Sequence, residues 1–220
     1  MKKLFTTRSG GLSTGAYHSF NLATHVGDDV SVVRENRLLL SRSYGEMQYM
    51  NQVHGSQVVI VEAVSEEAPT ADAIVSGIPG VGLAVMVADC IPLLMYSDVA
   101  VAAVHVGRRG LVNGVALSAL SAMREIGADQ IFAEIGPAIC GSCYEVSPEI
   151  FEEVTAVHSV AAAQTPQGTP ALNLPKALDA LLTSHGVSVT DHHVCTVESS
   201  DHFSYRRDGV TGRQIGFISL

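Results

Sequence analysis

The stretch GLAVMVADCIPLLMYSDVAVAAVHV, residues 82–106, decides the fold class. It contains three short apolar runs, at Gly82–Ala88, Pro92–Tyr96 and Val99–Val106, and each break between them contains an aspartate. Runs of this length and composition are typical of strands, and the lack of apolar-polar alternation indicates that both faces are buried. The stretch therefore predicts consecutive strands in the interior of the protein.

The rest of the chain supplies helices and further strands around this centre. Helices are predicted at Val30–Tyr44, Leu111–Ile126, Pro148–Val157 and Leu174–His185, and further strands at Gln57–Glu62, Ala71–Val75, Gln130–Ile135, Val187–Val197 and Gln214–Ser219. The segment Ser159–Leu172 is rich in Ala, Gln, Thr, Pro and Gly and is predicted to be a mobile loop. Because no internal repeat or linker is evident, residues 1–220 are expected to form one mixed α/β domain.

Composition and charge exclude several classes of partner. The apolar region Val81–Tyr96 is interrupted by Asp89 and Pro92, and it is shorter than the roughly 20 apolar residues that a membrane helix needs. No membrane partner is expected. The 13 basic residues against 22 acidic ones give a formal net charge of -9 without any block of Lys and Arg, so no nucleic-acid partner is expected either.

The opening sequence and the cysteine count indicate the compartment. The chain begins MKKLFTTRSGG, which lacks the apolar stretch of a secretory signal. Its four cysteines are too few for a disulfide framework in a chain of this length and are interpreted as thiols in a reducing compartment. The expected location is the cytoplasm, and each cysteine then has to be explained by packing, metal binding or catalysis.

Three segments each place a potential metal ligand at the end of a predicted strand: His54 in NQVHG, Cys90 in ADC and His105 in AVHVG. Two imidazoles and one thiolate are an accepted ligand set for a catalytic zinc ion, which keeps a fourth position open. Asp89, next to Cys90, could orient a ligand or move a proton. Because the three ligands are far apart in the sequence, spacing alone leaves open that each is a structural core residue.

Further segments extend this pattern along the chain. They are Thr7-Arg8-Ser9-Gly10-Gly11, Asn21-Leu22, Val26-Gly27-Asp28-Asp29, Glu35-Asn36-Arg37, Ile135-Gly136-Pro137-Ala138-Ile139, Tyr144-Glu145-Val146, Cys195-Thr196 and Phe203-Ser204-Tyr205-Arg206-Arg207-Asp208. Together with the three metal-ligand segments, and in this order, they resemble the YfiH-like laccase-domain family. The resemblance runs from about Phe5 to the last strand, so the combined pattern is highly specific.

The resemblance implies a single-domain, layered α/β/β/α fold with mixed β-sheets. It also implies a zinc ion, Zn2+, held by His54, Cys90 and His105, and purine nucleoside phosphorylase activity on purine nucleosides and phosphate. In this family the activity extends to adenosine deamination, for which an open zinc position activates water, and to cleavage of 5′-methylthioadenosine. The family usually has Trp where this chain has Arg108, which exchanges an aromatic surface for a charge and affects the expected substrate preference. A monomer or homodimer is expected.

Phosphorolysis requires positive charge that holds phosphate against C1′ of the sugar. A guanidinium can bind phosphate oxygens through two parallel hydrogen bonds. The candidate substrate-binding residues are Arg8, Asn21, Arg37, Arg109, Arg206 and Arg207. For each arginine, the alternative interpretation is a surface side chain or a structural ion pair.

A copper-dependent polyphenol oxidase is the first alternative function, because a two-histidine, one-cysteine set with an axial methionine binds copper, Cu2+. Met86 and Met95 flank Cys90. Multicopper oxidation also needs a second cluster rich in His-x-His pairs, and the nine histidines include no such pair. A Cys–His hydrolase, with Cys90 as nucleophile and His105 or His54 as base, is the second alternative. A metal-buffering or partner-binding domain without turnover is the third.

The remaining cysteines allow more than one interpretation. Cys140 and Cys143 form a C-x-x-C pair, which is typical of a redox site or of half a metal site. A second pair is missing and only Cys195 is left to join them, so free thiols are favoured over a structural zinc site. A histidine cluster lies near the carboxyl end, at His192, His193 and His202. Adjacent residues on a strand point to opposite faces, so at most one of these histidines is expected to take part in a site.

Overall fold

The computed structural model describes all 220 residues. The α-helices are α1 (Val30–Tyr44), α2 (Arg108–Val112), α3 (Val115–Ile126), α4 (Pro148–Val157), α5 (Leu174–Ser184) and α6 (Tyr205–Asp208), with short 3-10 helices η1 (Gly15–Tyr17) and η2 (Ser159–Ala161). The strands are β1 (Lys2–Phe5), β2 (Met47–Gln48), β3 (Val58–Ile60), β4 (Ala73–Ser76), β5 (Gly82–Val87), β6 (Ile91–Tyr96), β7 (Val101–Val106), β8 (Phe132–Ile135), β9 (Ala162–Gln164), β10 (Pro170–Leu172), β11 (Ser188–Asp191) and β12 (Gln214–Ser219).

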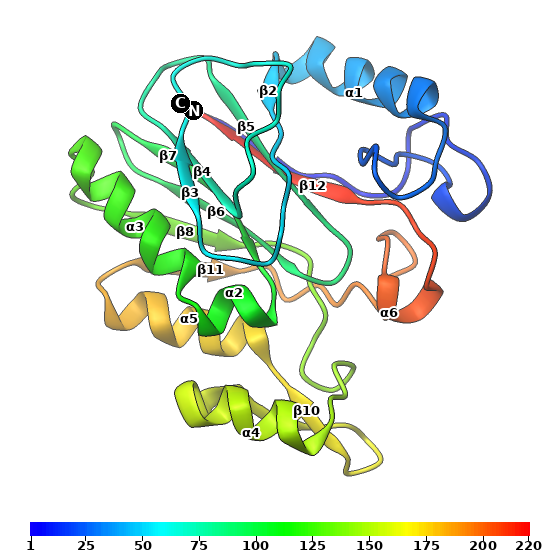
Figure 1. Ribbon diagram of the computed structural model, residues 1–220, viewed down its shortest axis with the longest axis vertical. Coiled ribbons are helices and arrows are strands. Elements are labelled where there is room, and N and C mark those ends of the chain that lie inside the picture. The colour runs from blue at the N-terminus through cyan, green and yellow to red at the C-terminus, as the bar shows by residue number, and fades with distance from the viewer.

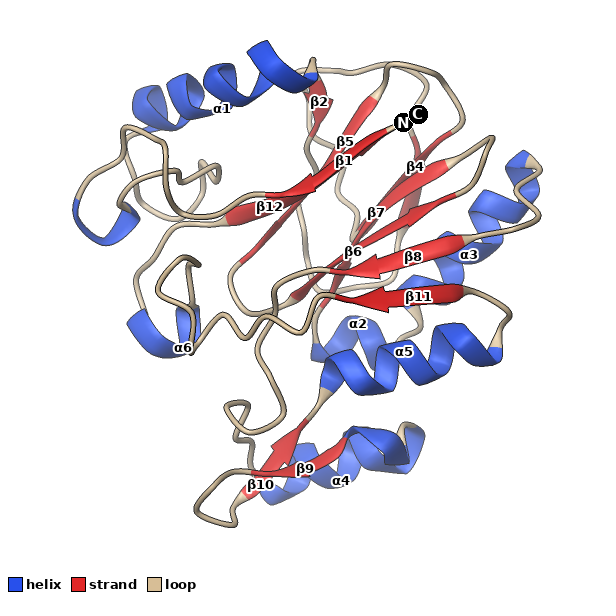
Figure 2. Cartoon of the chain, turned by 180° about the vertical axis from the view of Figure 1, so that it is seen from behind, coloured by secondary structure: helices blue, strands red, loops and turns tan.

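Two mixed sheets form the middle of the molecule, and helices lie on both outer sides (Figure 1). The four-stranded sheet has the order β1-β12-β5-β2, and the six-stranded sheet has the order β11-β8-β6-β7-β4-β3. Helix α1 lies on the side of the four-stranded sheet, whereas α2, α3 and α5 lie on the side of the six-stranded sheet (Figure 2). None of the helices combines the length and the apolar character needed to cross a membrane.

The central strands are buried on both faces because each sheet lies between two hydrophobic cores. Along β5, Leu83 belongs to the core between the sheets, whereas its neighbour Ala84 belongs to the core under α1. Along β7, Ala103 faces the core between the sheets, and Val104 faces the core under α3 and α5. Successive side chains of a strand point to opposite faces, so this alternation builds four layers. The predicted α/β/β/α fold is confirmed.

The predicted helix Val30–Tyr44 is confirmed, with the side chain of Asp29 capping its first turn. The predicted single helix Leu111–Ile126 is wrong, because the chain forms two helices, α2 and α3. Gly114 between them has a left-handed φ of 75°, which interrupts the helical hydrogen bonds and lets α3 start in a new direction.

Two predictions for the second half of the chain are also wrong. The segment Ser159–Leu172 is not a structureless loop, because it forms η2 and the antiparallel pair of β9 and β10. Its Leu172 is fully buried in the core, which holds the pair in place. The predicted strand Val187–Val197 ends at Asp191, and the later residue His193 has a φ of 55° that does not fit a strand.

Strand β1 was not predicted from the sequence, since two of its four residues are lysines. It pairs antiparallel with β12, Lys2 opposite Ser219, so that the two chain termini lie side by side (Figure 1). Lys3 of β1 also reaches Glu134 on β8 and forms an ion pair between the two sheets.

Candidate active site

The three predicted metal ligands come from separate elements and meet in space. His54 lies in the loop between β2 and β3, Cys90 in the turn between β5 and β6, and His105 in β7. Their ligand atoms all lie within 4.8 Å of one another, and Sγ of Cys90 is 3.9 Å from Nε2 of His54. The structure thus brings these three side chains together, which the sequence spacing alone could not establish.

The topology explains this convergence. The chain passes from the four-stranded to the six-stranded sheet between β5 and β6, and Cys90 lies at this crossing. The register of β6 and β7 places Ile91 opposite Val106, so Cys90 lies beside the end of β7. The strand neighbours of His105, Val104 and Val106, face the core under the outer helices. Successive side chains of a strand point to opposite faces, so the imidazole of His105 points toward the space between the sheets.

Asp72 holds the imidazole of His105 and the backbone of the loop that carries His54. Its Oδ1 lies 2.8 Å from Nδ1 of His105 and also accepts the backbone N–H of His54 at 2.9 Å, while its Oδ2 accepts that of Gly55 at 2.7 Å. A hydrogen bond from Nδ1 to the carboxylate leaves Nε2 of His105 free to bind a metal ion. The sequence contains one indication of this role: Asp72 is the only charged residue in the predicted strand Ala71–Val75, and a fully buried charge needs partners.

The electrostatics of the cluster favour a thiolate. Burial alone would raise the pKa of the Cys90 thiol, but the facing imidazoles of His105 and His54 lower this pKa to about 6. Burial would lower the pKa of His105, whereas the Cys90 thiolate and the Asp72 carboxylate raise it to about 9. Burial would raise the pKa of Asp72, but hydrogen bonds from His105 and from the backbone lower it to about 2. The thiolate is the form of cysteine that binds metal ions.

Gly107 leaves the space that this cluster needs. A Cβ atom at position 107 would lie 3.0 Å from Cδ2 of His54 and 3.1 Å from Sγ of Cys90. A larger residue here would therefore require the side chains of His54 and Cys90 to shift by a few tenths of an ångström. The small residue after β7 is thus part of the construction of the site.

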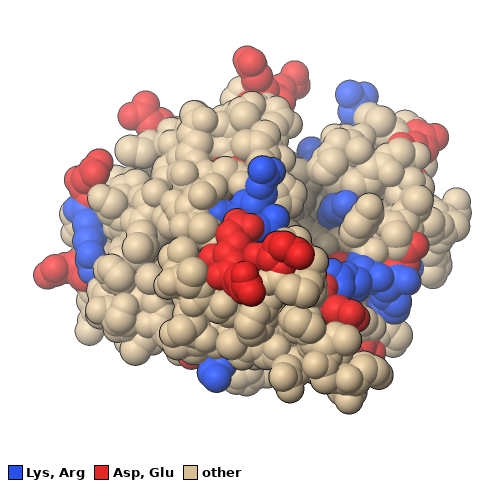
Figure 3. All heavy atoms as spheres, turned by 60° about the horizontal axis from the view of Figure 1, so that its bottom comes forward, with Lys and Arg blue, Asp and Glu red and all other residues tan.

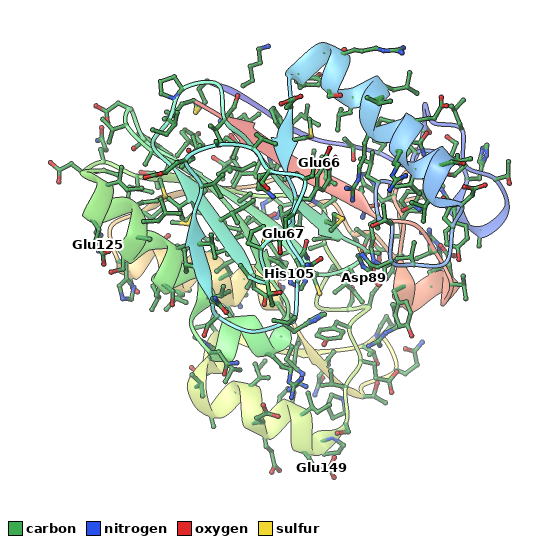
Figure 4. All side chains as sticks on the ribbon, turned by 45° about the horizontal axis from the view of Figure 1, so that its top comes forward. Glu66, Glu67, Asp89, His105, Glu125 and Glu149 are labelled. Carbon is green, nitrogen blue, oxygen red and sulfur yellow. The ribbon has the colours of Figure 1, made fainter.

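A cleft of about 470 Å³ opens beside the cluster, a size within the range of small-molecule sites. It is lined by His25, Gln52, His54, Met86, Val87, Ala88, Asp89, Cys90, His105, Ile139, Tyr144, Tyr205, Arg206 and Arg213. Figure 3 shows a hollow on one face of the molecule with basic side chains on both of its sides. Figure 4 shows His105 and Asp89 near the middle of the molecule, whereas Glu125 and Glu149 lie at its periphery.

Asp89 lies in the wall of this cleft and is held rigidly. Its Oδ1 accepts a 2.6 Å hydrogen bond from the hydroxyl of Thr196, and its Oδ2 accepts a 2.7 Å hydrogen bond from the backbone N–H of Arg206. Its own φ is 90°, a left-handed value uncommon for a side chain other than glycine. Asp89 therefore joins the turn before β6 to the segment that carries Arg206, whereas the carboxylate that contacts His105 is that of Asp72.

Two arginines reach the cleft. The guanidinium of Arg206 lies 5.1 Å from the ring centroid of Tyr144 and donates to the carbonyl of Glu145. Arg213, which was not among the predicted site residues, also lines the cleft. The buried side chain of Asn21 accepts the backbone N–H of Arg213 at 2.9 Å, so Asn21 supports the cleft without lining it.

The other candidate arginines have different surroundings. The guanidinium of Arg207 is occupied by carbonyl oxygens and an aspartate of its own segment. Arg37 is stacked 3.6 Å from the ring centroid of Tyr49, Arg8 donates to a nearby carbonyl, and Arg109 is exposed on α2. None of these four side chains lines the cleft.

Arg108, at the position where the family usually has Trp, forms an ion pair of 3.1 Å with Glu153 on α4. It does not line the cleft, whereas Tyr144 and Tyr205 do. Aromatic surface is therefore present beside the candidate metal ligands despite the departure at position 108.

Five polar or aromatic cleft residues were not anticipated as site residues: His25, Gln52, Tyr144, Tyr205 and Arg213. Isolated polar or aromatic residues in loops carry no periodic pattern, which explains why sequence reasoning passed over them. The amide of Gln52, for example, binds both the N–H and the carbonyl of Met86 on β5. This contact fixes the loop before His54 to the four-stranded sheet.

The carboxyl-terminal histidines lie outside the cleft. His192 contacts Glu134 at 3.2 Å, His193 contacts Asp191, and His202 contacts a serine hydroxyl. The predicted strand geometry at His192 and His193 does not apply, because β11 has ended before them.

Comparison with known proteins agrees with this geometry. Residues 2–220 match the family model described as multi-copper polyphenol oxidoreductase laccase. A purine nucleoside phosphorylase of Streptomyces coelicolor is 46% identical over 98% of this chain and 94% of its own length, and one of Streptomyces griseus is 44% identical over 98% and 93%.

Solved structures share the fold of this chain. A Neisseria meningitidis protein superimposes with a TM-score of 0.90 at 38% identity, covering 100% of this chain and 93% of its own. The YfiH protein of Bacillus licheniformis superimposes with a TM-score of 0.90 at 28% identity, covering 99% and 92%. Since the family model spans nearly every residue and these folds coincide along their length, the chain belongs to the YfiH-like laccase-domain family.

Proposed function

We propose that this protein is a zinc-dependent purine nucleoside phosphorylase that also deaminates adenosine and cleaves 5′-methylthioadenosine in the same cleft. The observation that carries the proposal is the convergence of His54, Cys90 and His105 at a cleft that two arginines also line. The relatives named as purine nucleoside phosphorylases support the substrate class.

His54, Cys90 and His105 would hold the zinc ion. The donor set fits, because it offers one thiolate and two imidazoles, and Gly107 leaves them room. Three protein donors leave a fourth position for a reactant, where zinc supplies Lewis-acid chemistry and a water of lowered pKa. The role of Asp72 is to present the correct nitrogen of His105.

The surroundings of the two methionines near Cys90 favour zinc over copper. A blue-copper site uses an axial methionine sulfur. Met95 is buried in the core under the outer helices, on the face of β6 that points away from the space between the sheets. The sulfur of Met86 accepts a hydrogen bond from Arg37 at 3.6 Å. Neither methionine is a free axial ligand in this arrangement.

Phosphorolysis breaks the bond between C1′ and the purine nitrogen, and a phosphate oxygen forms the new bond to C1′. The electron pair of the broken bond leaves with the base, so the products are ribose 1-phosphate and the purine. We assign the binding of phosphate to Arg206 and Arg213, the arginines that line the cleft. Tyr144 and Tyr205 offer aromatic faces for the base.

Adenosine deamination exchanges the amino group at C6 for oxygen from water and releases ammonia. It requires a group that takes a proton from the water and returns it to the leaving amine. Asp89 is our candidate, because its carboxylate lies in the cleft wall and is fixed by Thr196 and by the backbone of Arg206.

Chromatography of products tests the proposal. Adenosine with phosphate should give adenine and ribose 1-phosphate, adenosine alone should give inosine, and 5′-methylthioadenosine with phosphate should give adenine. The substitutions His54→Ala and Cys90→Ala should abolish all three reactions in folded protein. His185→Ala, which removes an exposed histidine outside the cleft, is the matched control and should retain them. Turnover that persists in folded, metal-stripped His54→Ala protein would contradict the proposal.

A Cys–His hydrolase is the second candidate, favoured by the 3.9 Å separation of Sγ of Cys90 from Nε2 of His54 in the cleft wall. Mass spectrometry of the zinc-loaded protein after turnover of an ester substrate distinguishes the two. An acyl adduct on Cys90 would support the hydrolase, whereas under the zinc proposal this thiolate is a metal ligand and stays unmodified.

A further inference from the structure

A second cluster of potential metal ligands lies outside the cleft. Cys140 and Cys143 lie in the loop between β8 and α4, and Cys195 and Glu198 lie in the segment between β11 and α6. The three sulfurs and a carboxylate oxygen all lie within 4.8 Å of one another. The structure therefore supplies the partners that the C-x-x-C pair lacked in the sequence.

Backbone pairing holds the two segments in register. Beyond the parallel strands β8 and β11, an isolated bridge joins Ala138 to Cys195. The N–H of Ala138 donates to the carbonyl of Val194, and the N–H of Thr196 donates back to Ala138, both at 3.1 Å. The cluster is thus built on an extension of the six-stranded sheet and not on two unconnected loops.

A tight turn orients the two sulfurs of the C-x-x-C pair. The N–H of Cys143 donates to the carbonyl of Cys140 at 3.2 Å. This turn reverses the chain direction and brings both sulfurs within 4.8 Å of the sulfur of Cys195. Sγ of Cys143 lies 3.6 Å from a carboxylate oxygen of Glu198. Cys195 is buried, the other two cysteines are half-buried and Glu198 is exposed, so the cluster is open to solvent on the side of Glu198.

The donor set matches the requirements of zinc. Thiolates at about 2.3 Å from a tetrahedral zinc ion lie about 3.8 Å from one another, and the ligand atoms here lie within 4.8 Å of one another before any adjustment. With a cation bound, the three cysteines would act as thiolates, and the cation would balance their negative charges. Four protein donors also fill a tetrahedral shell, unlike the three donors in the cleft.

We propose that Cys140, Cys143, Cys195 and Glu198 bind a second zinc ion in a closed, structural site. The site replaces the free thiols that the sequence pattern favoured. Its ligands leave no position for a reactant, so its function is to join the two segments that carry it.

These segments also form part of the cleft. Tyr144 follows Cys143 directly and lines the cleft. Thr196 follows Cys195 and donates to Asp89 in the cleft wall. A metal ion bound at the cluster would therefore fix two residues at the same time: Tyr144, which lines the cleft, and Thr196, which holds the carboxylate of Asp89.

Metal analysis and cobalt spectroscopy of the full chain test the proposal. Reduced wild-type protein loaded with zinc alone should hold about two equivalents, and Cys143→Ser and Cys90→Ser should each hold about one. Ser142→Ala, a change inside the C-x-x-C turn that keeps every proposed ligand, is the matched control and should hold about two. A total of about one equivalent in the wild type, with none left in folded Cys90→Ser, would overturn the second site.

Cobalt spectra keep the proposal falsifiable if Cys143→Ser does not fold. Cys90→Ser loaded with cobalt should retain a strong thiolate-to-cobalt absorption band, because three sulfurs remain at the second cluster. The absence of this band in folded protein would overturn the proposal. A disulfide between any two of the three cysteines in freshly reduced protein would also overturn it, since an oxidised pair cannot act as thiolate ligands.

Discussion

The Nδ1 atom of His105 lies 2.8 Å from Oδ1 of Asp72, and both side chains are almost completely buried. Asp72 also accepts backbone N–H groups of Val53, His54 and Gly55. One carboxylate therefore fixes the orientation of one ligand and the loop that carries another. The relative position of the two candidate histidine ligands therefore depends on Asp72.

Asp72→Asn should weaken zinc binding by about 10–100-fold, because an amide orients the imidazole less strongly and makes it a less basic ligand. Competition with a chromogenic chelator measures the affinity. Asp191→Asn is a matched control, because Asp191 also pairs with a histidine, His193, but lies outside the cleft. Equal zinc affinities for the two folded variants would contradict the role of Asp72.

Gly107→Ala should weaken zinc binding while leaving the fold intact. The added Cβ would lie 3.0 Å from Cδ2 of His54 and 3.1 Å from Sγ of Cys90, so at least one ligand has to move. Gly55→Ala is the control, since its Cβ would meet no atom closer than 3.4 Å. Circular dichroism checks the fold and metal analysis checks binding. The prediction fails if both variants retain zinc equally.

The layers of the fold could be predicted from the sequence because apolar runs such as Gly82–Ala88 and Val99–Val106 are too apolar to belong to a sheet with a solvent-exposed face. The break at Gly114 and the strands β9 and β10 could not, because a single glycine or a short Ala-rich run does not determine direction or pairing. Tertiary burial of residues such as Leu172 decided those elements.

The candidate metal ligands of the cleft were predicted through the family resemblance, and the structure places these three side chains together. Arg213 and Tyr144 were missed because convergence of distant loops leaves no trace in spacing. The same limit applies to Cys195, which follows the C-x-x-C pair by more than fifty residues and is brought to it only by the parallel pairing of β8 and β11.

Arg213→Gln should raise the KM for phosphate by about 10–100-fold, because a hydrogen bond to a charged group contributes about 1.5–3 kcal/mol and each 1.4 kcal/mol is about tenfold. The KM for the nucleoside should change less. Initial rates at varied phosphate and fixed nucleoside measure the effect. Arg109→Gln, an exposed arginine outside the cleft, should leave both constants unchanged. A larger effect on the KM for phosphate from Arg109→Gln than from Arg213→Gln would contradict the assignment of phosphate binding to Arg213.

Glu134 on β8 should stabilise the protein in a pH-dependent way. Burial would raise its pKa, but hydrogen bonds from Lys3 and His192 lower it below the ordinary value of 4.5. A carboxyl whose pKa is lowered in the folded state adds stability above its unfolded pKa and loses that contribution as the pH falls through the folded value. Lys3 belongs to the four-stranded sheet and Glu134 to the six-stranded sheet, so the lost interaction is one between the sheets.

Glu134→Gln should therefore lower the free energy of unfolding by about 1 kcal/mol near neutral pH, and the difference from wild type should shrink as the medium is acidified below the ordinary carboxyl pKa. Urea denaturation across this range measures it. Glu62→Gln removes an exposed carboxylate near β3 and serves as the control. Lys3 stays charged at every pH in the experiment. A difference that grows as the pH falls below the ordinary carboxyl pKa would therefore contradict a lowered pKa of Glu134 and the ion pair between the sheets.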